Sequence, residues 1–315
     1  MAQRVISREA FEKMYEAAFQ KKAELGIAKI SGGLKNRVYL VDDGKNKYVF
    51  KTGPLDNKMM APVDRNTISW EAKILKELED LDIGIPHVIY SSDGIEEYPY
   101  PFMFLNYLPG NNYLNCKENL TINQKREISY AIGQISRKIC DIKKDHYFVA
   151  SFPRKKFHNN YEFVSFLFEL LLKTYKKSEI NVDGITGDEI ANIIEKHKDA
   201  LNTVSSISLC NIDLWDGNIL VKDGKISGIV DFNDTFYCDE LMSFYFHLVE
   251  GETDDYFLLG YGKKELNSDE KIRVEIYRLY VVLKMIVDCE IKHYGRFGHI
   301  YSNFIKIYNK LLNMN

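Results

Sequence analysis

Residues 209–234 read LCNIDLWDGNILVKDGKISGIVDFND and carry the clearest signal in the chain. Asp213 and Asn218 are five residues apart, and two apolar runs then lead to Asp231. Between these runs, residues 222–225 contain Asp-Gly, which is a strong signal for a β-hairpin. Such a hairpin returns Asn218 and Asp231 to one edge, within reach of one cation. The spacing predicts a carboxylate that orients a hydroxyl, and two oxygen ligands that hold magnesium at a nucleotide's phosphates.

The same residues also have a purely structural interpretation. Asp213 and Asn218 are residue types that cap their own backbone in loops, and Asp231 is a common turn residue. An Asp and an Asn at this spacing are weak evidence alone. The choice therefore depends on whether the N-terminal part of the chain supplies the rest of a nucleotide site.

A glycine pair lies between the first two strands that the N-terminal part predicts. Ser31-Gly32-Gly33 separates an apolar run from strands expected at 37–41 and 48–51. Glycines at such a position let backbone N–H groups approach a phosphate that side chains would block. A plain hairpin turn is the alternative.

Lys51 and Glu71 predict a buried ion pair. Alternation along the third strand places Lys51 on one face together with Val49. A helix over 68–81, capped by Asn66 or Thr67, carries Glu71 on the apolar stripe of Ile68, Ile74, Leu75 and Leu78. A carboxylate on an apolar face is costly unless it is paired, and such a pair grips the α- and β-phosphates in kinases. The alternatives are a lysine at a sheet edge and a glutamate at the margin of the stripe.

A lobe boundary is expected near residues 105–110. There an apolar strand runs into Asn106-Tyr107-Leu108 and then into Pro-Gly. The exposed backbone of Asn106 to Leu108 is expected to pair with an adenine edge. We therefore predict an N-terminal nucleotide-binding lobe over 1–108 and a C-terminal helical lobe over 109–315, with helices near 5–25, 121–142, 160–176, 187–203, 239–250, 268–294 and 298–313.

Composition narrows the classes of protein. The chain has 315 residues, 45% of them hydrophobic and 28% charged, which is typical of a globular protein with a real core. A net charge of −3 argues against a nucleic-acid partner. Five scattered cysteines without a C-x-x-C pattern predict reduced thiols and no zinc site. No segment has the length of a signal peptide core or a membrane span, so we expect a cytoplasmic protein without membrane contact.

With these residues in hand, the chain resembles the aminoglycoside phosphotransferase family, whose relatives include fructosamine and choline kinases. The resemblance runs from about Ile30 to Glu250 and is strongest in NIDLWDGNILVKDGKISGIVDFNDTFYCDE, which is similar to the family's H-x-D-x-x-x-x-N loop, its I-I-D-[FW] strand and the aspartate a few residues beyond. It implies an α+β, protein-kinase-like fold with a small β-rich lobe and a larger helical lobe, and it implies ATP or GTP with Mg²⁺. Mapped onto this chain, it implies Asp213 as the catalytic residue, Asn218 and Asp231 as metal ligands, and nucleotide contacts from Ser31, Gly32, Gly33, Asn36, Lys51, Glu71, Asn106 and Leu108.

The chain departs from the family pattern at two positions. The loop histidine is Asn211, whose amide can still brace the loop by hydrogen bonds. Cys140 stands where many relatives carry a histidine, and we interpret it as a packing residue. Asp239 matches an aspartate that supports the catalytic loop from behind in the family. The loss of the histidine keeps a nucleotide-binding pseudokinase open as an alternative.

The substrate is expected to be a small, cationic molecule with a hydroxyl, and the protein is expected to be a monomer or weak dimer. We predict an aminoglycoside O-phosphotransferase with an anionic pocket, with candidate substrate contacts at Asp216, Asn233 and Glu250, next to further acids at Glu252, Asp254 and Asp255. The acids at 250–255 are equally explained as a solvated loop. A fructosamine or amino-sugar kinase, or a choline kinase with an aromatic cage, is the alternative. A protein kinase is disfavoured because no Ala-Pro-Glu motif follows Asp231.

Overall fold

The computed structural model describes residues 6–30, 36–53, 61–65, 67–247, 255–292, 295 and 297–314. Its contacts divide the chain into two compact units. Unit 1 comprises Met1–Lys58, Asn66–Leu120 and Asp216–Asp234, and unit 2 comprises Met59–Arg65, Thr121–Trp215 and Thr235–Asn315. The fold is α+β, with a β-rich first unit and a mainly helical second unit, as predicted. The predicted lobe limits differ from these units at 59–65, 109–120 and 216–234, and the lobe boundary itself stays a prediction.

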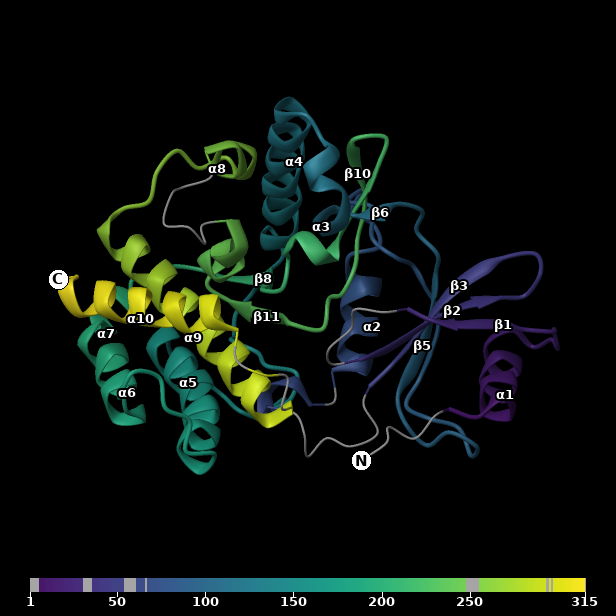
Figure 1. Ribbon diagram of the computed structural model, residues 1–315, viewed down its shortest axis with the longest axis horizontal. Coiled ribbons are helices and arrows are strands. Elements are labelled where there is room, and N and C mark those ends of the chain that lie inside the picture. Colours follow the sequence, from purple (N-terminus) through teal and green to yellow (C-terminus); the bar gives the residue numbers. More distant parts are fainter. Residues whose placement is uncertain are drawn as a thin grey trace. The chain divides into compact units, whose positions relative to one another are not determined.

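Unit 1 contains an antiparallel sheet in the order β1-β2-β3-β5-β4 (Figure 1). Its strands are β1 (Gly26–Lys29), β2 (Arg37–Asp42), β3 (Lys47–Thr52), β4 (Val88–Ser92) and β5 (Phe102–Asn106). The β2–β3 connection turns at Gly44, whose φ of 81° is natural for glycine. Asp43 Oδ1 accepts the backbone N–H groups of Lys45 and Asn46 in this turn, which joins the two strands expected at 37–41 and 48–51.

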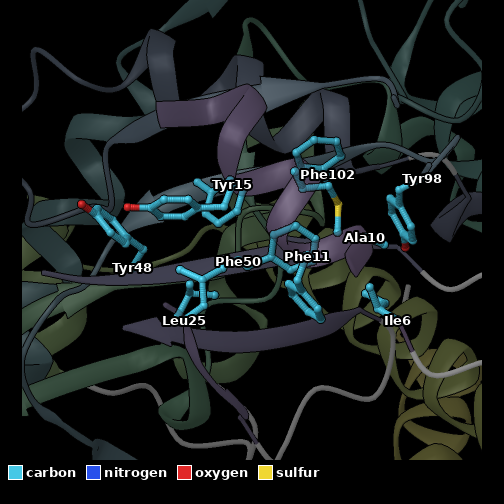
Figure 2. Close-up of a cluster of buried hydrophobic side chains, with 12 residues drawn as sticks. Ile6, Ala10, Phe11, Tyr15, Leu25, Tyr48, Phe50, Tyr98 and Phe102 are labelled. Carbon is cyan, nitrogen blue, oxygen red and sulfur yellow. The ribbon is translucent and has the colours of Figure 1, made fainter. Parts of the chain in front are cut away.

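An aromatic core lies between this sheet and α1 (Arg8–Phe19), as Figure 2 shows. Phe11 of α1 meets Phe50 of β3 edge to face, with ring centroids 5.0 Å apart. Because successive strand residues point to opposite faces, Phe50 faces α1 while Lys51 faces α2 (Ile68–Glu77). The predicted helix over 5–25 is shorter than expected, because Gln20 adopts the left-handed conformation that ends α1.

A second, three-stranded sheet of unit 1 joins distant parts of the sequence. It pairs β6 (Asn111–Asn112) with β9 (Ile219–Lys222), and β9 with β10 (Lys225–Ile229). The predicted hairpin turn is present, and both Asp223 and Gly224 have positive φ, as a tight two-residue turn requires. Beside β6 lie α3 (Tyr113–Cys116) and η3 (Lys117–Asn119), and η4 (Asp216–Asn218) leads into β9.

Close backbone approach fixes the hairpin within unit 1. Ile229 N–H donates to Gly84 O at 2.9 Å, and the strand pairing shifts register near Gly228. A Cβ atom at Gly228 would lie 2.7 Å from Leu108 Cδ1 and 3.2 Å from Gly84 O. A side chain at this position would force Leu108 and the Gly84 carbonyl to shift, so glycine suits the close packing of the hairpin against these residues.

Unit 2 combines a small sheet, β7-β8-β11, with helices (Figure 1). The predicted helix over 187–203 is two helices, because His197 takes a non-helical conformation between them. The helix expected over 239–250 is a 3-10 helix up to His247, and its last residues lie outside the described part of the chain. The elements are η2 (Pro62–Asp64), α4 (Ile122–Cys140), β7 (Lys143–Lys144), α5 (Asn160–Lys177), α6 (Gly187–Lys196), α7 (Lys198–Leu201), β8 (Ile207–Asn211), β11 (Thr235–Cys238), η5 (Glu240–His247), α8 (Asp255–Tyr261), α9 (Ser268–Lys292) and α10 (Gly298–Asn313).

None of the helices in the described residues combines the length and the hydropathy that crossing a bilayer requires. The long helix α9 is instead a buried packing element of unit 2, in contact with α5 and α10.

Candidate active site

The predicted contact between Lys51 and Glu71 is present in unit 1. Lys51 Nζ donates to Glu71 Oε1 at 2.8 Å, and the residues are 4% and 1% exposed. Glu71 lies one turn inside α2, on the apolar stripe that also buries Ile68, Ile74 and Leu75. An ion pair this deep requires both partners, because the loss of one leaves an uncompensated buried charge.

Lys51 has a second carboxylate partner that the pattern did not indicate. Its Nζ also donates to Asp231 Oδ1 at 2.9 Å, so one ammonium bridges two carboxylates. Burial lowers the pKa of Lys51, but Asp231 and Glu71 outweigh burial and raise the pKa above its usual value. Burial raises the pKa of Glu71, with the charge of Lys51 acting in the opposite direction. Lys51 is thus a fixed positive charge beside Asp231.

The base of the hairpin brings Asn218 and Asp231 to one edge of unit 1. Val230 N–H donates to Asn218 O at 2.9 Å, one residue before Asp231. Asp231 has a φ of 67°, an uncommon conformation for a residue other than glycine and one that recurs at functional sites. The Asp231 side chain is 34% exposed, in contrast to the buried Lys51.

The donor chemistry at this edge fits Mg²⁺. Carboxylate and amide oxygens are the protein ligands that Mg²⁺ takes, usually one or two of them together with substrate phosphates. Within the described residues, no group of three or more His, Cys, Asp or Glu side chains forms a metal site. Asn218 and Asp231 therefore suit a metal shared with a nucleotide rather than a closed protein cage.

Thr67, the N-cap residue of α2, and Phe232 and Asn233, which follow Asp231, join this network. Thr67 Oγ1 donates to Asn233 Oδ1 at 3.2 Å, and Asn233 Nδ2 donates to Asp231 Oδ1. Phe232 N–H donates to Glu71 Oε1 at 3.0 Å. The N-cap residue and first turn of α2 therefore hold the two residues that follow the predicted metal ligand.

Asp213 lies in unit 2, at the end of β8. Asn211 Oδ1 accepts the Asp213 N–H at 3.0 Å, and Trp215 N–H donates to Asp213 O at 3.0 Å. The buried Asn211 amide thus braces the loop directly at the predicted catalytic residue, which is the use that the sequence assigned to it. The role of Asp213 in catalysis stays a prediction.

A model of the phosphotransferase enzyme family matches residues 26–271. The chain belongs to this family. The match covers Lys51, Glu71, Asp213, Asn218 and Asp231, and it confirms the family that the sequence resemblance predicted. The protein is accordingly a small-molecule kinase of the phosphotransferase enzyme family.

Relatives of this phosphotransferase include proteins with different named substrates. A probable ketoamine kinase of Vibrio vulnificus is 24% identical over 292 residues, 90% of this chain and 91% of that protein. A candidate fructosamine-3-kinase from Haemophilus somnus has a TM-score of 0.69 at 17% identity, covering 96% of this chain and 97% of the other. The streptomycin–ATP ternary complex of APH(2")-IIa has a TM-score of 0.62 at 19% identity, covering 98% and 97%. At these identities, the likeness to solved structures establishes the fold alone.

Asp239 of the phosphotransferase holds α9 within unit 2. Its Oδ2 accepts Arg273 Nε at 2.8 Å and Tyr277 OH at 2.7 Å. Burial raises the pKa of Asp239, and Arg273 and Tyr277 act against that rise. Asp239 O also accepts from Cys210 Sγ of β8 at 3.4 Å, and the support of the catalytic loop by Asp239 stays a prediction.

Cys140 is a buried packing residue, as interpreted. Its Sγ lies 3.9 Å from Cys210 Sγ and 3.7 Å from Ser243 Oγ. The pKa of the Cys140 thiol is raised well above its usual range by its contact with Cys210 and by burial, so the thiol stays protonated.

The remaining nucleotide candidates lie around the first sheet of unit 1. Asn36 is buried just before β2, and Asn106 ends β5, where its Oδ1 accepts His87 N–H at 2.5 Å. Leu108 is half-buried beside Gly228, and no hydrogen bond of its backbone occurs in the described part of the chain. Ser31, Gly32 and Gly33 lie outside the described residues.

The candidate substrate residues have protein partners or lie outside the described residues. Asp216 Oδ2 accepts Lys117 Nζ at 2.9 Å, so its charge is paired. Asn233 is buried and uses its amide on Thr67 and Asp231. Glu250, like Glu252 and Asp254, lies outside the described residues, while Asp255 begins α8.

The sequence carries no signal for the contact between the Thr67 side chain and Asn233, and none for the ion pair between Lys117 and Asp216. The sequence predicts Thr67 only as a helix cap, yet its side chain makes no capping bond. Lys117 has no local signal, because its partner Asp216 is 99 residues away.

Proposed function

We propose that this kinase transfers the γ-phosphoryl group of Mg-ATP or Mg-GTP to a hydroxyl of a small molecule. The observation that carries the proposal is the buried Lys51, which contacts Glu71 at 2.8 Å and Asp231 at 2.9 Å. A lysine held by a helix glutamate and directed at the metal-binding aspartate is the arrangement that phosphoryl transfer uses.

Positioning and charge neutralisation supply most of the rate in such a reaction. Lys51, held by Glu71, would bind the α- and β-phosphates. Asn218 and Asp231 would hold the magnesium, which when bound neutralises charge on the phosphates. Asp213 would orient the acceptor hydroxyl and accept its proton late in the step, so that the hydroxyl oxygen attacks the γ-phosphorus in line as the bond to the β-phosphate oxygen breaks.

We propose a ketoamine, a sugar-derived amine adduct, as the acceptor class. The Vibrio vulnificus relative supports this choice, because the alignment spans 90% of this chain and 91% of that protein. The ion pair between Asp216 and Lys117 also supports a ketoamine acceptor. Lys117 neutralises the charge of Asp216, which the sequence predicted as part of an anionic pocket. A polycationic acceptor gains less from a carboxylate that already has a partner.

An aminoglycoside acceptor is the second candidate. Its support is the match over 97% or more of both chains to aminoglycoside phosphotransferases at TM-scores of 0.61 to 0.62. A choline-type acceptor would be recognised by diphosphate release stimulated by choline, and a pseudokinase by nucleotide binding without release.

A coupled assay of nucleoside diphosphate release tests the proposal. Mg-ATP and Mg-GTP are each offered with a panel of fructosamines, amino sugars, aminoglycosides and choline. We expect release stimulated by fructosamines, and we expect Asp213→Ala to lose about 10³-fold or more in turnover while it still binds the nucleotide. Turnover close to that of the native protein in Asp213→Ala would remove Asp213 from the mechanism.

The panel also separates the competing functions. Stimulation by aminoglycosides alone would replace the ketoamine proposal with the second candidate. Nucleotide binding without release for any acceptor would favour the pseudokinase, and Asn211→His would then test whether the missing histidine is the reason.

A further inference from the structure

We infer that Thr67 and Asn233 form a clamp that positions the carboxylate of Asp231 and thereby sets the affinity of the kinase for its magnesium–nucleotide complex. The inference rests on the proposed function, since Asp231 is the proposed magnesium ligand. It assigns Asn233 to Asp231 rather than to the substrate, and it gives Thr67 a role that no sequence motif indicated.

The clamp is a directed chain of hydrogen bonds. Thr67 Oγ1 donates to Asn233 Oδ1 at 3.2 Å, and Asn233 Nδ2 donates to Asp231 Oδ1. Lys51 Nζ donates to the same Asp231 oxygen at 2.9 Å. Donors from two directions on one oxygen restrict rotation of the carboxylate about its Cβ–Cγ bond, which fixes where that group meets a cation.

The Thr67 hydroxyl satisfies the acceptor end of the Asn233 amide while the donor end faces Asp231. An amide has a donor end and an acceptor end, and only the donor end is favourable against a carboxylate. By donating to Oδ1, Thr67 holds the acceptor end of the amide and so restrains Asn233 with Nδ2 against Asp231. Thr67 is 6% exposed and Asn233 is 4% exposed, so water has little access to replace either contact.

The clamp also attaches Asp231 to the helix that carries Glu71. Thr67 and Glu71 are four residues apart, and they bind the consecutive residues Asn233 and Phe232. The N-cap residue and the first turn of α2 therefore hold the Asn233 side chain and the Phe232 backbone, directly after Asp231. Because Asp231 has a φ of 67°, its conformation needs such support from its surroundings.

The magnitude follows from the behaviour of residues that support metal ligands. The loss of a hydrogen-bond partner of a ligand typically costs about 10- to 100-fold in metal affinity or activity. Asn233→Ala removes the side-chain partner but keeps the Asn233 backbone N–H, 3.5 Å from the same oxygen, and we expect a shift within that range. Thr67→Val removes only the hydroxyl that holds the acceptor end of the amide, and we expect a shift of about 3- to 10-fold.

The test compares four single variants of the full chain. Thr67→Val is nearly isosteric but lacks the hydroxyl, Thr67→Ser retains the hydroxyl, and Asn233→Ala removes the amide. Ser69→Ala on α2 is the matched control, because it removes an exposed hydroxyl that bonds to Asp93 and not to the clamp. For each protein, the affinity for a non-hydrolysable ATP analogue is measured by calorimetry at a series of Mg²⁺ concentrations and in EDTA, and thermal unfolding is recorded.

We expect Thr67→Val to raise the half-saturating Mg²⁺ concentration while metal-free nucleotide affinity stays within about twofold, because the clamp acts on the metal ligand. Thr67→Ser should restore the native Mg²⁺ dependence, and Ser69→Ala should leave it unchanged. Equal weakening of metal-free and metal-dependent binding, or Thr67→Val with native Mg²⁺ dependence, would overturn the inference. If Asn233→Ala does not fold, Thr67→Val and Thr67→Ser still test whether the clamp acts on the Mg²⁺ dependence.

Failure of the inference differs from failure of the proposed function. A native protein whose nucleotide affinity does not respond to Mg²⁺ would refute the proposed function itself. If the nucleotide affinity of the native protein responds to Mg²⁺ and the affinities of the clamp variants respond equally, only the clamp is refuted.

Discussion

Replacement of Lys51 by methionine tests the central ion pair most directly. Lys51→Met keeps a side chain of similar length but leaves the 1% exposed Glu71 without its ammonium partner. At the observed 2.8 Å, two unit charges attract by roughly 6 kcal/mol at an effective dielectric constant of 20, before desolvation is subtracted. Breaking a buried pair by removing one partner typically costs about 3–5 kcal/mol, and we expect a loss of that size in the free energy of unfolding.

The loss should depend on pH because the remaining carboxyl can be protonated. Burial raises the pKa of Glu71 in the folded protein, and without Lys51 nothing in the pair opposes that effect. A group whose folded pKa lies above its unfolded value contributes stability below the unfolded pKa and loses it as pH rises through the folded pKa. The deficit of Lys51→Met relative to the native protein should therefore be larger at pH 8 than at pH 5.

A double-mutant cycle with Glu71→Gln isolates the pair. The double variant carries no buried carboxylate at position 71, so we expect it to be more stable than the sum of the single changes by about 2 kcal/mol. Urea unfolding at pH 5 and pH 8 gives all the required values. A Lys51→Met deficit below about 1 kcal/mol that is the same at both pH values, with no coupling in the cycle, would refute the buried pair.

Two other predictions concern unit 1 away from the ion pair. Asp43→Asn should lower stability by about 2 kcal/mol near pH 6, because charged hydrogen bonds contribute about 1.5–3 kcal/mol. The hydroxyl of Tyr15, with Lys21 and turn N–H groups, lowers the pKa of Asp43, so its contribution is present above the unfolded pKa and is lost as pH falls through the folded one. Urea unfolding from pH 6 to pH 3 should show the difference between the two proteins begin to shrink once the pH falls below the unfolded pKa; a constant difference contradicts this. Gly228→Ala should lower the free energy of unfolding by about 1–3 kcal/mol, because the added Cβ would lie 2.7 Å from Leu108 Cδ1. Thermal unfolding measures this effect, with Gly298→Ala as the control because its added Cβ meets nothing within 4 Å. Equal melting temperatures for the two variants would contradict the prediction.

Local patterns predicted the hairpin and the ion pair for identifiable reasons. The β9–β10 hairpin follows from an Asp-Gly turn between apolar runs, and both turn residues have the expected positive φ. The Lys51–Glu71 contact follows because a carboxylate on the apolar stripe of a helix needs a nearby cation. The hairpin is thus encoded by turn residues between apolar runs, and the ion pair by the periodicity of the helix and the cost of burying a charge.

The remaining contacts depend on tertiary proximity that no local pattern encodes. Lys51 and Asp231 are 180 residues apart, and Thr67 and Asn233 are 166 apart. His197, between α6 and α7, also has a distant partner, because its Nε2 lies 2.9 Å from Leu311 O of α10, 114 residues away.

The division into units separates two parts of the proposed chemistry. Lys51, Glu71, Asn218 and Asp231 all belong to unit 1, although they come from two distant parts of the sequence. The hairpin joins that unit through its contacts near Gly84, whereas Asp213 belongs to unit 2. The groups proposed to bind the nucleotide and its metal are thus distinct from the group proposed to orient the acceptor. For this reason Asp213→Ala should abolish turnover and spare nucleotide binding, and changes at Thr67 or Asn233 should first alter the response to Mg²⁺.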